Sequence, residues 1–341
     1  MKKLVIIGGG FAGAYIAKKL EDHFETTLID TKDYFEFTPS ILRTLVEPSH
    51  SKKIHARHAD YLKKAHFING EASKITKGNV TVNNSRIKFD YLAICSGSRY
   101  SLPIKHKNIL LTSRTSEIKS YAKKLEDARK ILIVGGGPVG IELAAEIATK
   151  YPDKNLILLH SKSLFLKRLN SKCHEYSYRF LSKRNASFIL NERLVKYNKV
   201  FVTDKNRKIR ADIAFLCTGI TPNSEFLKRG DIKLDKKNYV IVNNFLQAKG
   251  HSNIFAAGDI ASIQEEKTAQ NSEKQARIVV KNIMHIEKNE QLEQYDSSQR
   301  IMVISLGKYD GIMTYKNHAV KGIIPGILKS IIELKTMLRY K

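Results

Sequence analysis

Two stretches of the chain share one pattern of apolar and small residues. Residues 4–20 read LVIIGGGFAGAYIAKKL, and residues 131–147 read ILIVGGGPVGIELAAEI. In each stretch a short apolar run comes before three glycines, and a segment with helical periodicity follows them. A short apolar run that ends at glycine is typical of a buried strand. The pattern therefore predicts two strand–turn–helix units, each the start of a βαβ unit.

A second pattern also occurs twice. Residues 79–98 (NVTVNNSRIKFDYLAICSGS) and 193–219 (RLVKYNKVFVTDKNRKIRADIAFLCTG) each predict a polar hairpin, a buried strand and a glycine turn. Another apolar run, NIFAAGD at 253–259, and a helical segment at 268–284 follow. Strands that alternate with helices favour an α/β fold with parallel sheets. The duplicated order predicts two Rossmann-like dinucleotide-binding domains.

The first glycine turn has the spacing of a dinucleotide site. Its residues are Gly8, Gly10, Phe11, Ala12 and Gly13. Glycine there permits a tight turn, close approach of the backbone to a diphosphate, and packing of the helix on the strand. The N-terminus of the helix adds free N–H groups that attract the anion. Asp30, followed by Thr31, ends the next strand and is placed to bind a ribose diol.

The second glycine turn differs from the first where the acid would be expected. Its residues are Gly135, Gly137, Pro138, Val139 and Gly140. At the end of the next strand the chain has His160, followed by Ser161 and Lys162. No carboxylate is present there to repel a 2′-phosphate, and Lys162 is placed to attract one, so we expect NADPH to be accepted as well as NADH. The alternative is that Lys162 and Lys167 are solvated surface charges.

Two dinucleotide sites in one chain indicate that electrons pass from one dinucleotide to the other. At this point the sequence resembles the flavoproteins with two dinucleotide-binding domains. The resemblance rests on GGGFAG with Asp30, LAICSGS, GGGPVGIELA, FLCTGITPNSEF and NIFAAGDIASI, in this order. It implies FAD as a bound cofactor and NADH or NADPH as the hydride donor. It also implies an FAD domain (1–105 and 233–300) interrupted by an NAD(P)H domain (106–232), followed by an amphipathic C-terminal segment (301–341).

Within this superfamily, DYFEFTPSILRTLVEP at 33–48 and KTAQNSEKQARIVVKNI at 267–283 resemble the type II NADH dehydrogenases. They also resemble the short relatives of those enzymes, the apoptosis-inducing-factor-like and ferroptosis-suppressor quinone reductases. The resemblance implies catalytic or orienting roles for Glu142, Gln270 and Lys274. Lys274 departs from the motif, which has a second glutamine there, and it is either a charge near the acceptor or a solvated lysine. Glu142 is alternatively an ordinary helix charge.

The resemblance assigns further residues to the two dinucleotides. Those expected at FAD, besides the first glycine turn, Asp30 and Thr31, are Pro39, Arg43, Ala72, Ser96, Gly97, Gly258 and Asp259. Those expected at NAD(P)H, besides the second glycine turn, are Glu142, His160, Lys162 and Gly219. The four histidines of residues 50–66 have no compact ligand spacing, so we expect no metal site.

Cysteine usage and charge narrow the function classes. Cys95, Cys173 and Cys217 are isolated and form no CxxC motif, which disfavours thiol chemistry of the disulfide-reductase or sulfide-oxidising kind and favours a reducing compartment. The formal net charge of +26 favours anionic partners, although it also reflects a lysine-rich composition. No apolar run reaches the roughly 18–20 residues of a membrane-spanning helix.

The tail has a different character from the rest of the chain. After a break at Pro325 and Gly326, residues 327–341 predict a basic amphipathic helix with Ile327, Ile331 and Leu334 on one face. Such a helix suits docking in the plane of a membrane surface. The alternatives are packing on the protein's own core or on a second subunit in a homodimer.

The residues and the resemblance together predict an FAD-dependent NAD(P)H:quinone oxidoreductase, peripheral on the cytoplasmic side of a membrane. One alternative is a reductase of a small acidic redox protein such as a ferredoxin. Another is an apoptosis-inducing-factor-like flavoprotein that binds nucleic acid. The sequence contains no RNA- or DNA-binding motif, so we rank nucleic acid low as a partner.

Overall fold

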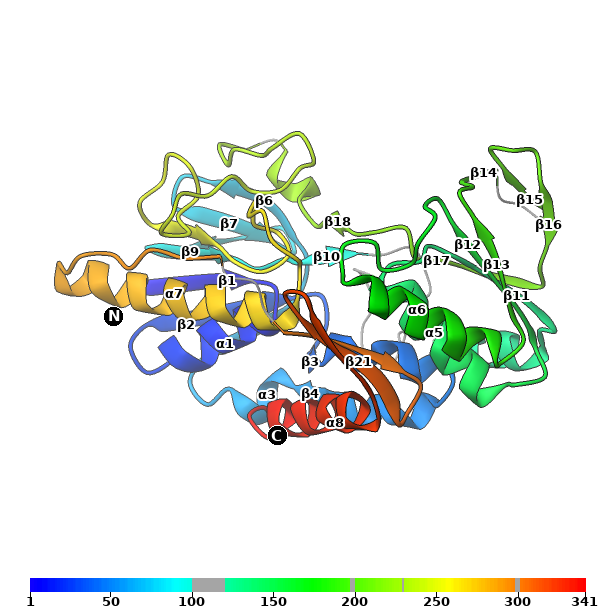
Figure 1. The fold of residues 1–341 in the computed structure, drawn as a ribbon. Helices are drawn as coiled ribbons and strands as arrows, with labels where there is room; N and C mark the ends of the chain where they lie inside the picture. The colour runs from blue at the N-terminus through cyan, green and yellow to red at the C-terminus, as the bar shows by residue number, and fades with distance from the viewer. Residues whose placement is uncertain (100–119, 197–199, 229, 298–300) are drawn as a thin grey trace.

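The computed structural model describes residues 1–99, 120–196, 200–228, 230–297 and 301–341. The described elements form two α/β domains and a C-terminal sheet with one helix (Figure 1). Each predicted glycine turn lies between a buried strand and a helix. The predicted fold class, with two Rossmann-like parallel sheets, is confirmed.

The first domain is built on a five-stranded parallel sheet of order β19-β9-β1-β2-β5. Its strands are β1 (Lys3–Ile7), β2 (Glu25–Asp30), β5 (His66–Asn69), β9 (Tyr91–Ile94) and β19 (Ile254–Ala256). Helices α1 (Phe11–Leu20) and α7 (Ala269–Lys288) pack together on one face. The antiparallel sheet β6 (Ala72–Thr76), β7 (Asn79–Val82) and β8 (Ser85–Lys88) lies on the other face (Figure 1).

Strand β1 shows why this sheet is covered on both faces. Successive side chains of a strand point to opposite faces. Leu4 and Ile6 belong to the apolar cluster that includes α1 and α7, whereas Val5 and Ile7 belong to the cluster with the β6–β8 sheet. All four side chains are buried. A continuous apolar run is therefore what this strand requires.

The second domain repeats the arrangement. Its parallel sheet has the order β13-β12-β11-β17. The strands are β11 (Lys130–Val134), β12 (Asn155–His160), β13 (Ala186–Leu190) and β17 (Ile213–Leu216). Helices α5 (Pro138–Lys150) and α6 (Ser171–Ser182) cover one face, and the antiparallel strands β14 (Leu194–Lys196), β15 (Val200–Thr203) and β16 (Lys208–Arg210) cover the other (Figure 1).

Short elements connect the two domains. Strand β10 (Ser98–Arg99) follows β9 of the first domain, β18 (Thr221–Pro222) follows β17 of the second, and the two pair antiparallel. The remaining short elements are β3 (Tyr34–Glu36), η1 (Thr38–Leu45), η2 (Pro48–His50), α2 (Ser51–Ile54), β4 (His55–Arg57), α3 (His58–Tyr61) and η3 (Glu225–Leu227). Helix η1 extends from the first domain and contacts α5 of the second.

The C-terminal segment is more than a helix. It begins with a three-stranded antiparallel sheet, which the sequence analysis did not predict, formed by β20 (Met302–Leu306), β21 (Asp310–Tyr315) and β22 (His318–Gly322). Helix α8 (Ile323–Met337) follows. The predicted break at Pro325 and Gly326 is wrong, because both residues lie in the first turn of α8, where proline costs no internal hydrogen bond. Gly326 is needed there, since an added Cβ would lie 2.6 Å from the Tyr309 carbonyl carbon.

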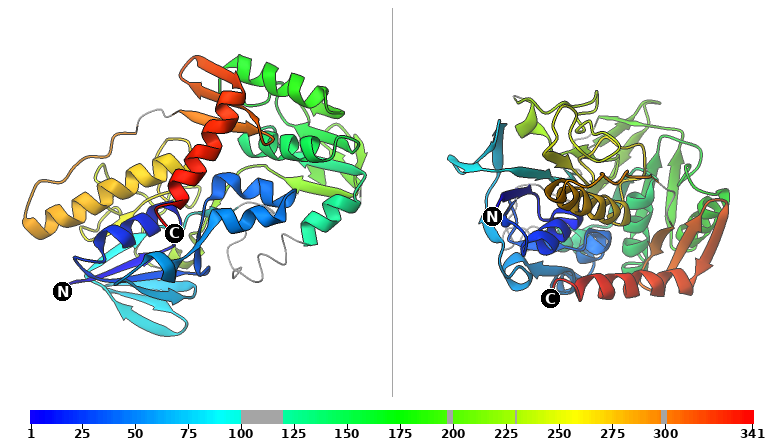
Figure 2. Two further views of the ribbon diagram at one scale, coloured as in Figure 1. Left: turned by 90° about the horizontal axis from the view of Figure 1, so that it is seen from below. Right: turned by 90° about the vertical axis from the view of Figure 1, so that its left-hand side faces the viewer.

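Helix α8 lies across the outside of the molecule and contacts both domains. Figure 2 shows it running from the β20–β22 sheet beside the second domain to the C-terminus beside α1. At that end the backbone carbonyl of Arg339 accepts a hydrogen bond from Lys18 of α1. Tyr340 is buried and stacks on Phe35 with ring centroids 4.1 Å apart. The tail is therefore an integral part of the fold.

Candidate functional site

The two glycine turns open into one continuous cavity of about 2510 Å³. A drug-sized ligand commonly occupies about 300–1,000 Å³, so the cavity has room for two dinucleotides. Both turns follow the carboxyl ends of parallel strands, which is where ligands bind in open α/β sheets. Most of the predicted site residues line it: Gly8, Gly10, Phe11, Ala12, Asp30, Thr31, Pro39, Ser96, Gly97, Gly258, Asp259, Gly135, Gly137, Pro138, Val139, Glu142, His160, Lys162, Gly219 and Gln270.

The first glycine turn is shaped for close approach of a diphosphate. Gly8 has φ +100°, and an added Cβ would lie 2.2 Å from the Cys95 carbonyl oxygen. At Gly13 an added Cβ would lie 1.8 Å from the Gly8 carbonyl oxygen, so α1 packs directly against the turn. Gly10 is different. It lines the cavity, and no atom lies within 4 Å of the position that a Cβ would take there. The turn thus presents backbone N–H groups of α1 to open space, which fits the diphosphate of FAD.

Asp30 closes this turn from the end of β2. Its Oδ2 accepts the Gly9 N–H at 2.5 Å, and its Oδ1 accepts the Lys32 N–H at 3.0 Å. These bonds orient the carboxylate at the wall of the cavity, where the remaining acceptor capacity of its oxygens is available to a ribose diol. The observed geometry therefore fits the adenosine ribose of FAD.

A buried histidine that the sequence analysis did not single out lies behind Asp30. His58 is fully buried, and its Nδ1 lies 2.6 Å from the Tyr61 hydroxyl. Its Nε2 lies 4.0 Å from Asp30 Oδ2 and has no hydrogen-bond partner among the described residues. Burial lowers the pKa of His58 to about 4, and the negative charge of Asp30 opposes this shift. The imidazole is therefore neutral near pH 7.

The turn at Gly258 and Asp259 lies opposite the first glycine turn, since an added Cβ at Gly258 would lie 3.6 Å from Ala12 Cβ. Asp259 accepts a hydrogen bond from the Ser98 hydroxyl at 2.5 Å. The Gly258 N–H donates to Gln275 Oε1 at 2.6 Å, and Gln275 Nε2 donates to Glu265 at 2.6 Å. Gln275 is buried, so it holds the glycine turn from the side of α7. The motifs of the sequence gave Gln275 no role.

The second glycine turn reproduces the first. Gly135 has φ +120° and meets the Cys217 carbonyl oxygen, and Gly140 meets the Gly135 carbonyl oxygen, at the same distances of 2.2 and 1.8 Å from an added Cβ. Gly137 again has open space at the Cβ position. His160 Nδ1 accepts the Gly136 N–H at 3.1 Å, which is the bond that the carboxylate makes in the first turn. An imidazole thus replaces an acid in the same structural role.

This bond determines the protonation of His160. A nitrogen that accepts a hydrogen bond carries no proton, so the remaining proton of the neutral ring is on Nε2. Burial lowers the pKa of His160, and the nearby charge of Lys162 acts in the same direction. Lys162, Lys167 and Arg193 line this end of the cavity with exposed side chains. This end of the cavity therefore carries several cationic side chains, and His160 contributes no negative charge.

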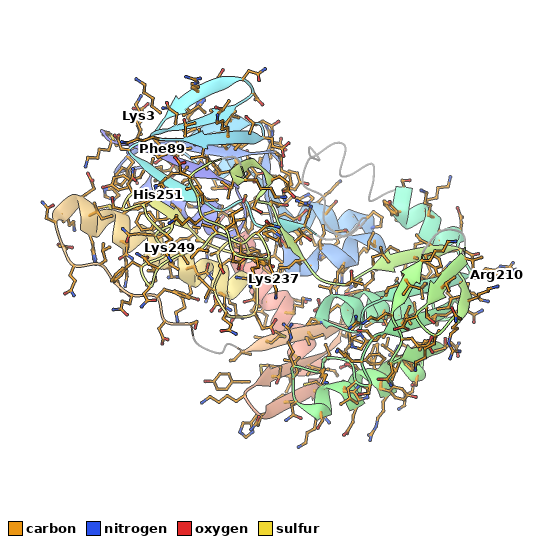
Figure 3. The ribbon with its side chains drawn as sticks, turned by 90° about the horizontal axis from the view of Figure 1, so that it is seen from above. Lys3, Phe89, Arg210, Lys237, Lys249 and His251 are labelled. Atoms are coloured by element: carbon orange, nitrogen blue, oxygen red, sulfur yellow. The ribbon has the colours of Figure 1, made fainter. Side chains whose placement is uncertain are left out.

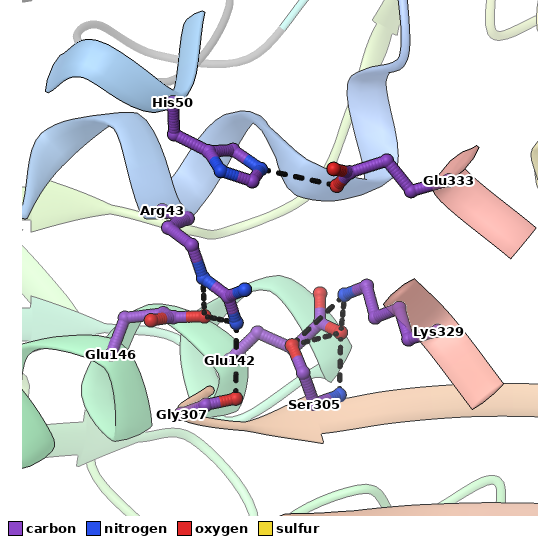
Figure 4. Close-up of polar contacts among 8 residues, drawn as sticks. All are labelled: Arg43, His50, Glu142, Glu146, Ser305, Gly307, Lys329 and Glu333. Atoms are coloured by element: carbon purple, nitrogen blue, oxygen red, sulfur yellow. Dashed lines mark hydrogen bonds and ion pairs between the residues drawn. The ribbon is translucent and has the colours of Figure 1, made fainter. Parts of the chain in front are cut away.

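The second domain and the C-terminal segment meet at Glu142 (Figure 4). Glu142 Oε1 accepts the Ser305 N–H at 2.9 Å, the Ser305 hydroxyl at 3.2 Å and the Lys329 ammonium at 2.5 Å. Lys329 also donates to Ser305 Oγ at 2.9 Å. Both Glu142 and Lys329 line the cavity. Sequence reasoning found Glu142 but missed Lys329 and Ser305 as its partners, because no local motif connects them.

Five predicted residues do not line this cavity. Gly13, Ala72 and Gly140 pack behind it, whereas Arg43 and Lys274 are directed elsewhere. The Arg43 guanidinium donates to Glu146 at 2.8 Å and to the Gly307 carbonyl at 3.2 Å, so it bridges the two domains instead of facing a diphosphate. Lys274 donates to the Asp296 carbonyl, which turns its ammonium away from the cavity.

The cysteines and the possible metal ligands are the remaining reactive side chains. Cys95, Cys173 and Cys217 are free and buried. Burial raises the pKa of the Cys95 and Cys217 thiols to about 12, so both are protonated at neutral pH. Within the described residues, no group of three or more His, Cys, Asp or Glu side chains could hold a metal ion. None of the helices in the described part of the chain is long and apolar enough to cross a membrane.

The fold and the paired glycine turns define a flavoprotein with two dinucleotide-binding domains. The chain belongs to the pyridine nucleotide-disulphide oxidoreductase family, whose sequence model matches residues 2–276. It is therefore an FAD-dependent NAD(P)H oxidoreductase, as the resemblance of its motifs predicted.

Individual relatives agree with this family. The chain is 32% identical to apoptosis-inducing factor homolog B of Dictyostelium discoideum, over 91% of this chain and 89% of that protein. It is 30% identical to ferroptosis suppressor protein 1 of Homo sapiens, over 96% and 92%. Among solved structures, the sulfide:quinone oxidoreductase of Aquifex aeolicus has a TM-score of 0.85 at 18% identity, over 100% of this chain and 91% of that one. NDH2 of Plasmodium falciparum in complex with NADH has a TM-score of 0.82 at 14% identity, over 98% and 94%. These two structures share the fold.

Proposed function

We propose that the protein is an NAD(P)H:quinone oxidoreductase that works at a membrane surface. The observation that carries this proposal is the extent of the cavity. Its lining includes both glycine turns and also Ile332, Lys335 and Thr336 of α8. A lipophilic acceptor at this end would lie directly under a helix whose outer face is apolar. The similarity to a sulfide:quinone oxidoreductase is consistent with a quinone as this acceptor.

The two turns would divide the cofactors between them. The first turn, Asp30 and Asp259 would hold FAD, and the second turn with His160 would hold NAD(P)H. When bound, FAD accepts a hydride from NAD(P)H and passes two electrons to the acceptor. The chain's contribution is to place the two dinucleotides at one junction and to exclude water from it.

Lys329 and Glu142 would act at this junction. Lys329 brings a positive charge to the wall of the cavity, where it would stabilise negative charge that develops on an acceptor during reduction. Glu142 holds the ammonium in place through the 2.5 Å contact, and Ser305 restrains both groups. Gln270 lines the same cavity and offers an amide for hydrogen bonding. Lys274 is not part of this proposal, since its ammonium is directed at Asp296.

Helix α8 supports the membrane part of the proposal, because three of its polar side chains face inward. Lys329 bonds Glu142, Glu333 bonds His50, and Thr336 is buried. The large apolar side chains face outward, with exposed fractions from 50% to 69%: Ile323, Ile324, Ile327, Ile331, Leu334 and Leu338. A contiguous exposed apolar patch of this kind marks an interaction site.

A membrane surface is the partner that we propose for this patch, on the cytoplasmic side. Lys335 and Lys341 lie at the same end of the chain and would interact with anionic lipid headgroups. Positive charge is also found far from α8, for example at Lys3 and Lys249 on the first domain and Arg210 on the second (Figure 3). A second copy of the chain is the alternative partner for the apolar face.

The first test is anaerobic rapid mixing of the purified flavoprotein. NADH or NADPH should bleach the flavin absorbance, and a short-chain quinone should restore it within the turnover time. The same experiment with ferredoxin in place of the quinone tests the alternative function, because a ferredoxin reductase would be reoxidised by ferredoxin. If NAD(P)H bleaches the flavin and the quinone does not restore its absorbance, the proposed acceptor is wrong, although the family assignment stands.

A further inference from the structure

A histidine–carboxylate pair lies near the end of the main cavity that Lys329 and α8 line. The pair has no role in the function proposed so far. His50 Nε2 lies 3.1 Å from Glu333 Oε2, between η2 and α8. We propose that His50 and Glu333 form the outer part of a proton path that leads through Lys329 to the acceptor. This inference rests on the proposed function, because it concerns the proton that quinone reduction consumes.

The stoichiometry of quinone reduction requires such a proton. NAD(P)H donates a hydride, which carries two electrons and one proton. A quinone becomes a quinol by taking up two electrons and two protons. One further proton per turnover must therefore come from solvent and reach the acceptor.

Helix geometry brings the members of the path together. Lys329 and Glu333 are four residues apart on α8, so their side chains are neighbours on one face of the helix. Figure 4 shows this face directed inward, with Glu333 at His50 and Lys329 at Glu142 and Ser305. The side chain of Glu333 is 14% exposed and that of His50 is 6% exposed. Glu333 therefore has limited access to solvent, and Lys329 lies between this pair and the main cavity.

A small polar cavity lies between Glu333 and Lys329. Its volume is about 10 Å³, which is close to the minimum that one water molecule needs. Its polar lining residues are Ser40, Arg43, Glu146, Ser305, Lys329, Ser330 and Glu333. Such a lining supplies the several hydrogen-bonding partners that an internal water requires. Lys329 borders both this small cavity and the main cavity, so it is placed to pass a proton from one to the other.

The charges around the pair allow it to exchange a proton. Burial opposes ionisation of Glu333, but hydrogen bonds from His50 and Ser40 and the charge of Arg43 together hold the pKa of Glu333 below its ordinary value. The charged and titratable groups that face the small cavity come from η1 (Arg43), α5 (Glu146) and α8 (Lys329 and Glu333). The imidazole of His50, from η2, faces this set through the Nε2 atom that contacts Glu333, and a ring nitrogen can either donate or accept a proton.

The neighbouring Arg43–Glu146 pair supplies a matched control. It belongs to the same layer of polar contacts and is also largely buried, with 14% and 8% of the side chains exposed. Arginine does not release its proton in proteins, so this pair contributes to structure but not to proton transfer. Glu146 also lines the small cavity, and Gln at this position keeps a hydrogen-bonding side chain there. Glu146→Gln should therefore lower stability without a specific effect on proton delivery.

The test compares His50→Gln, His50→Ala and Glu333→Gln with Glu146→Gln in the FAD-loaded protein. Reduction of the flavin by NAD(P)H consumes no solvent proton, so all variants should retain its rate. Reoxidation by a short-chain quinone should slow about tenfold or more in the three path variants. It should also show an increased solvent deuterium isotope effect. Added imidazole should restore the rate of His50→Ala and should leave the rate of Glu146→Gln unchanged.

A measurement independent of turnover completes the test. Nitrogen-15 NMR of labelled histidine should show that a ring proton of His50 exchanges with solvent in the holoprotein. Quinone reoxidation at the wild-type rate in His50→Gln, or a His50 ring proton that does not exchange with solvent, would overturn the path alone. If a quinone fails to reoxidise the wild-type protein, the proposed function is wrong and the path fails with it.

Discussion

Lys329 Nζ lies 2.5 Å from Glu142 Oε1, and 187 residues separate the two positions in the chain. The contact joins the C-terminal helix to the helix that follows the second glycine turn. Only 13% of the lysine side chain and 11% of the glutamate side chain are exposed. The last twenty residues of the chain therefore complete the wall of the site, and this relationship leads to the first prediction.

Lys329→Met should destabilise the protein strongly. It leaves the Glu142 carboxylate buried without its cation, and loss of one partner of a buried pair costs about 3–5 kcal/mol. Urea unfolding of the holoprotein measures the change. Lys281→Met is the control, because the Lys281–Glu293 pair is exposed and should contribute less than about 1 kcal/mol. Equal effects of the two substitutions would show that the buried pair has no special role.

His160→Asp should shift donor choice towards NADH. The introduced carboxylate can accept the Gly136 N–H as Asp30 accepts the Gly9 N–H, so the turn should be preserved. Its negative charge would repel a 2′-phosphate, and we expect KM for NADPH to rise about tenfold or more relative to KM for NADH. His174→Asp changes a histidine that does not line the cavity and serves as the control. An unchanged ratio of the two KM values would remove His160 from donor selection.

The protein should become less stable as the pH is lowered, because of His58. Its pKa is about 4 in the folded protein and 6.5 in the unfolded chain. Between these values the unfolded chain binds a proton at this residue and the folded chain does not. The free energy of unfolding should therefore decrease as pH falls from about 6.5 to about 4, by about 3 kcal/mol in total for this residue.

Urea unfolding at several pH values measures this dependence. His58→Gln should reduce the slope with pH in that window, whereas His66→Gln, at an exposed position on β5, should leave it unchanged. Identical slopes for wild-type protein and His58→Gln would contradict the assignment.

Two substitutions in the first glycine turn should separate folding from cofactor binding. Gly13→Ala places a Cβ 1.8 Å from the Gly8 carbonyl oxygen, so we expect destabilisation of about 3 kcal/mol or more. Gly10→Ala meets no atom within 4 Å and has ordinary backbone angles, so the apoprotein should fold normally. Its methyl group would occupy the approach to the diphosphate, and FAD affinity should fall about tenfold or more. Full FAD affinity in Gly10→Ala would place the diphosphate elsewhere.

The outer face of α8 should control membrane binding. In flotation assays with vesicles that contain anionic lipid, the double substitution Ile327→Glu and Ile331→Glu should abolish binding, because two charges would enter the lipid interface. Reduction of a water-soluble quinone should be unaffected. Leu164→Glu, at an exposed apolar residue on the loop after β12, should bind vesicles as the wild type does. If the double variant instead converts a wild-type dimer to a monomer, the apolar face is a subunit contact.

The sequence by itself determined the parts of this protein that depend on local spacing. Apolar runs, glycine spacing and one acid predicted both glycine turns, since the positive φ of Gly8 and Gly135 and the tight approach at Gly13 and Gly140 arise within a few tens of residues. Helical periodicity likewise placed Ile327, Ile331 and Leu334 on one face of α8, and all three side chains are exposed. The same motifs led to the family and to the cofactors.

Only the tertiary structure decided where the charged side chains point. A motif placed Arg43 at a diphosphate, but the approach of α5 supplies Glu146, and the buried guanidinium requires that carboxylate. Lys274 is turned towards Asp296 by a segment that follows α7. Lys329 meets Glu142 because the β20–β22 sheet carries α8 across both domains. Long flexible side chains form ion pairs with whatever the fold brings near, and one-dimensional periodicity contains no information about such distant contacts.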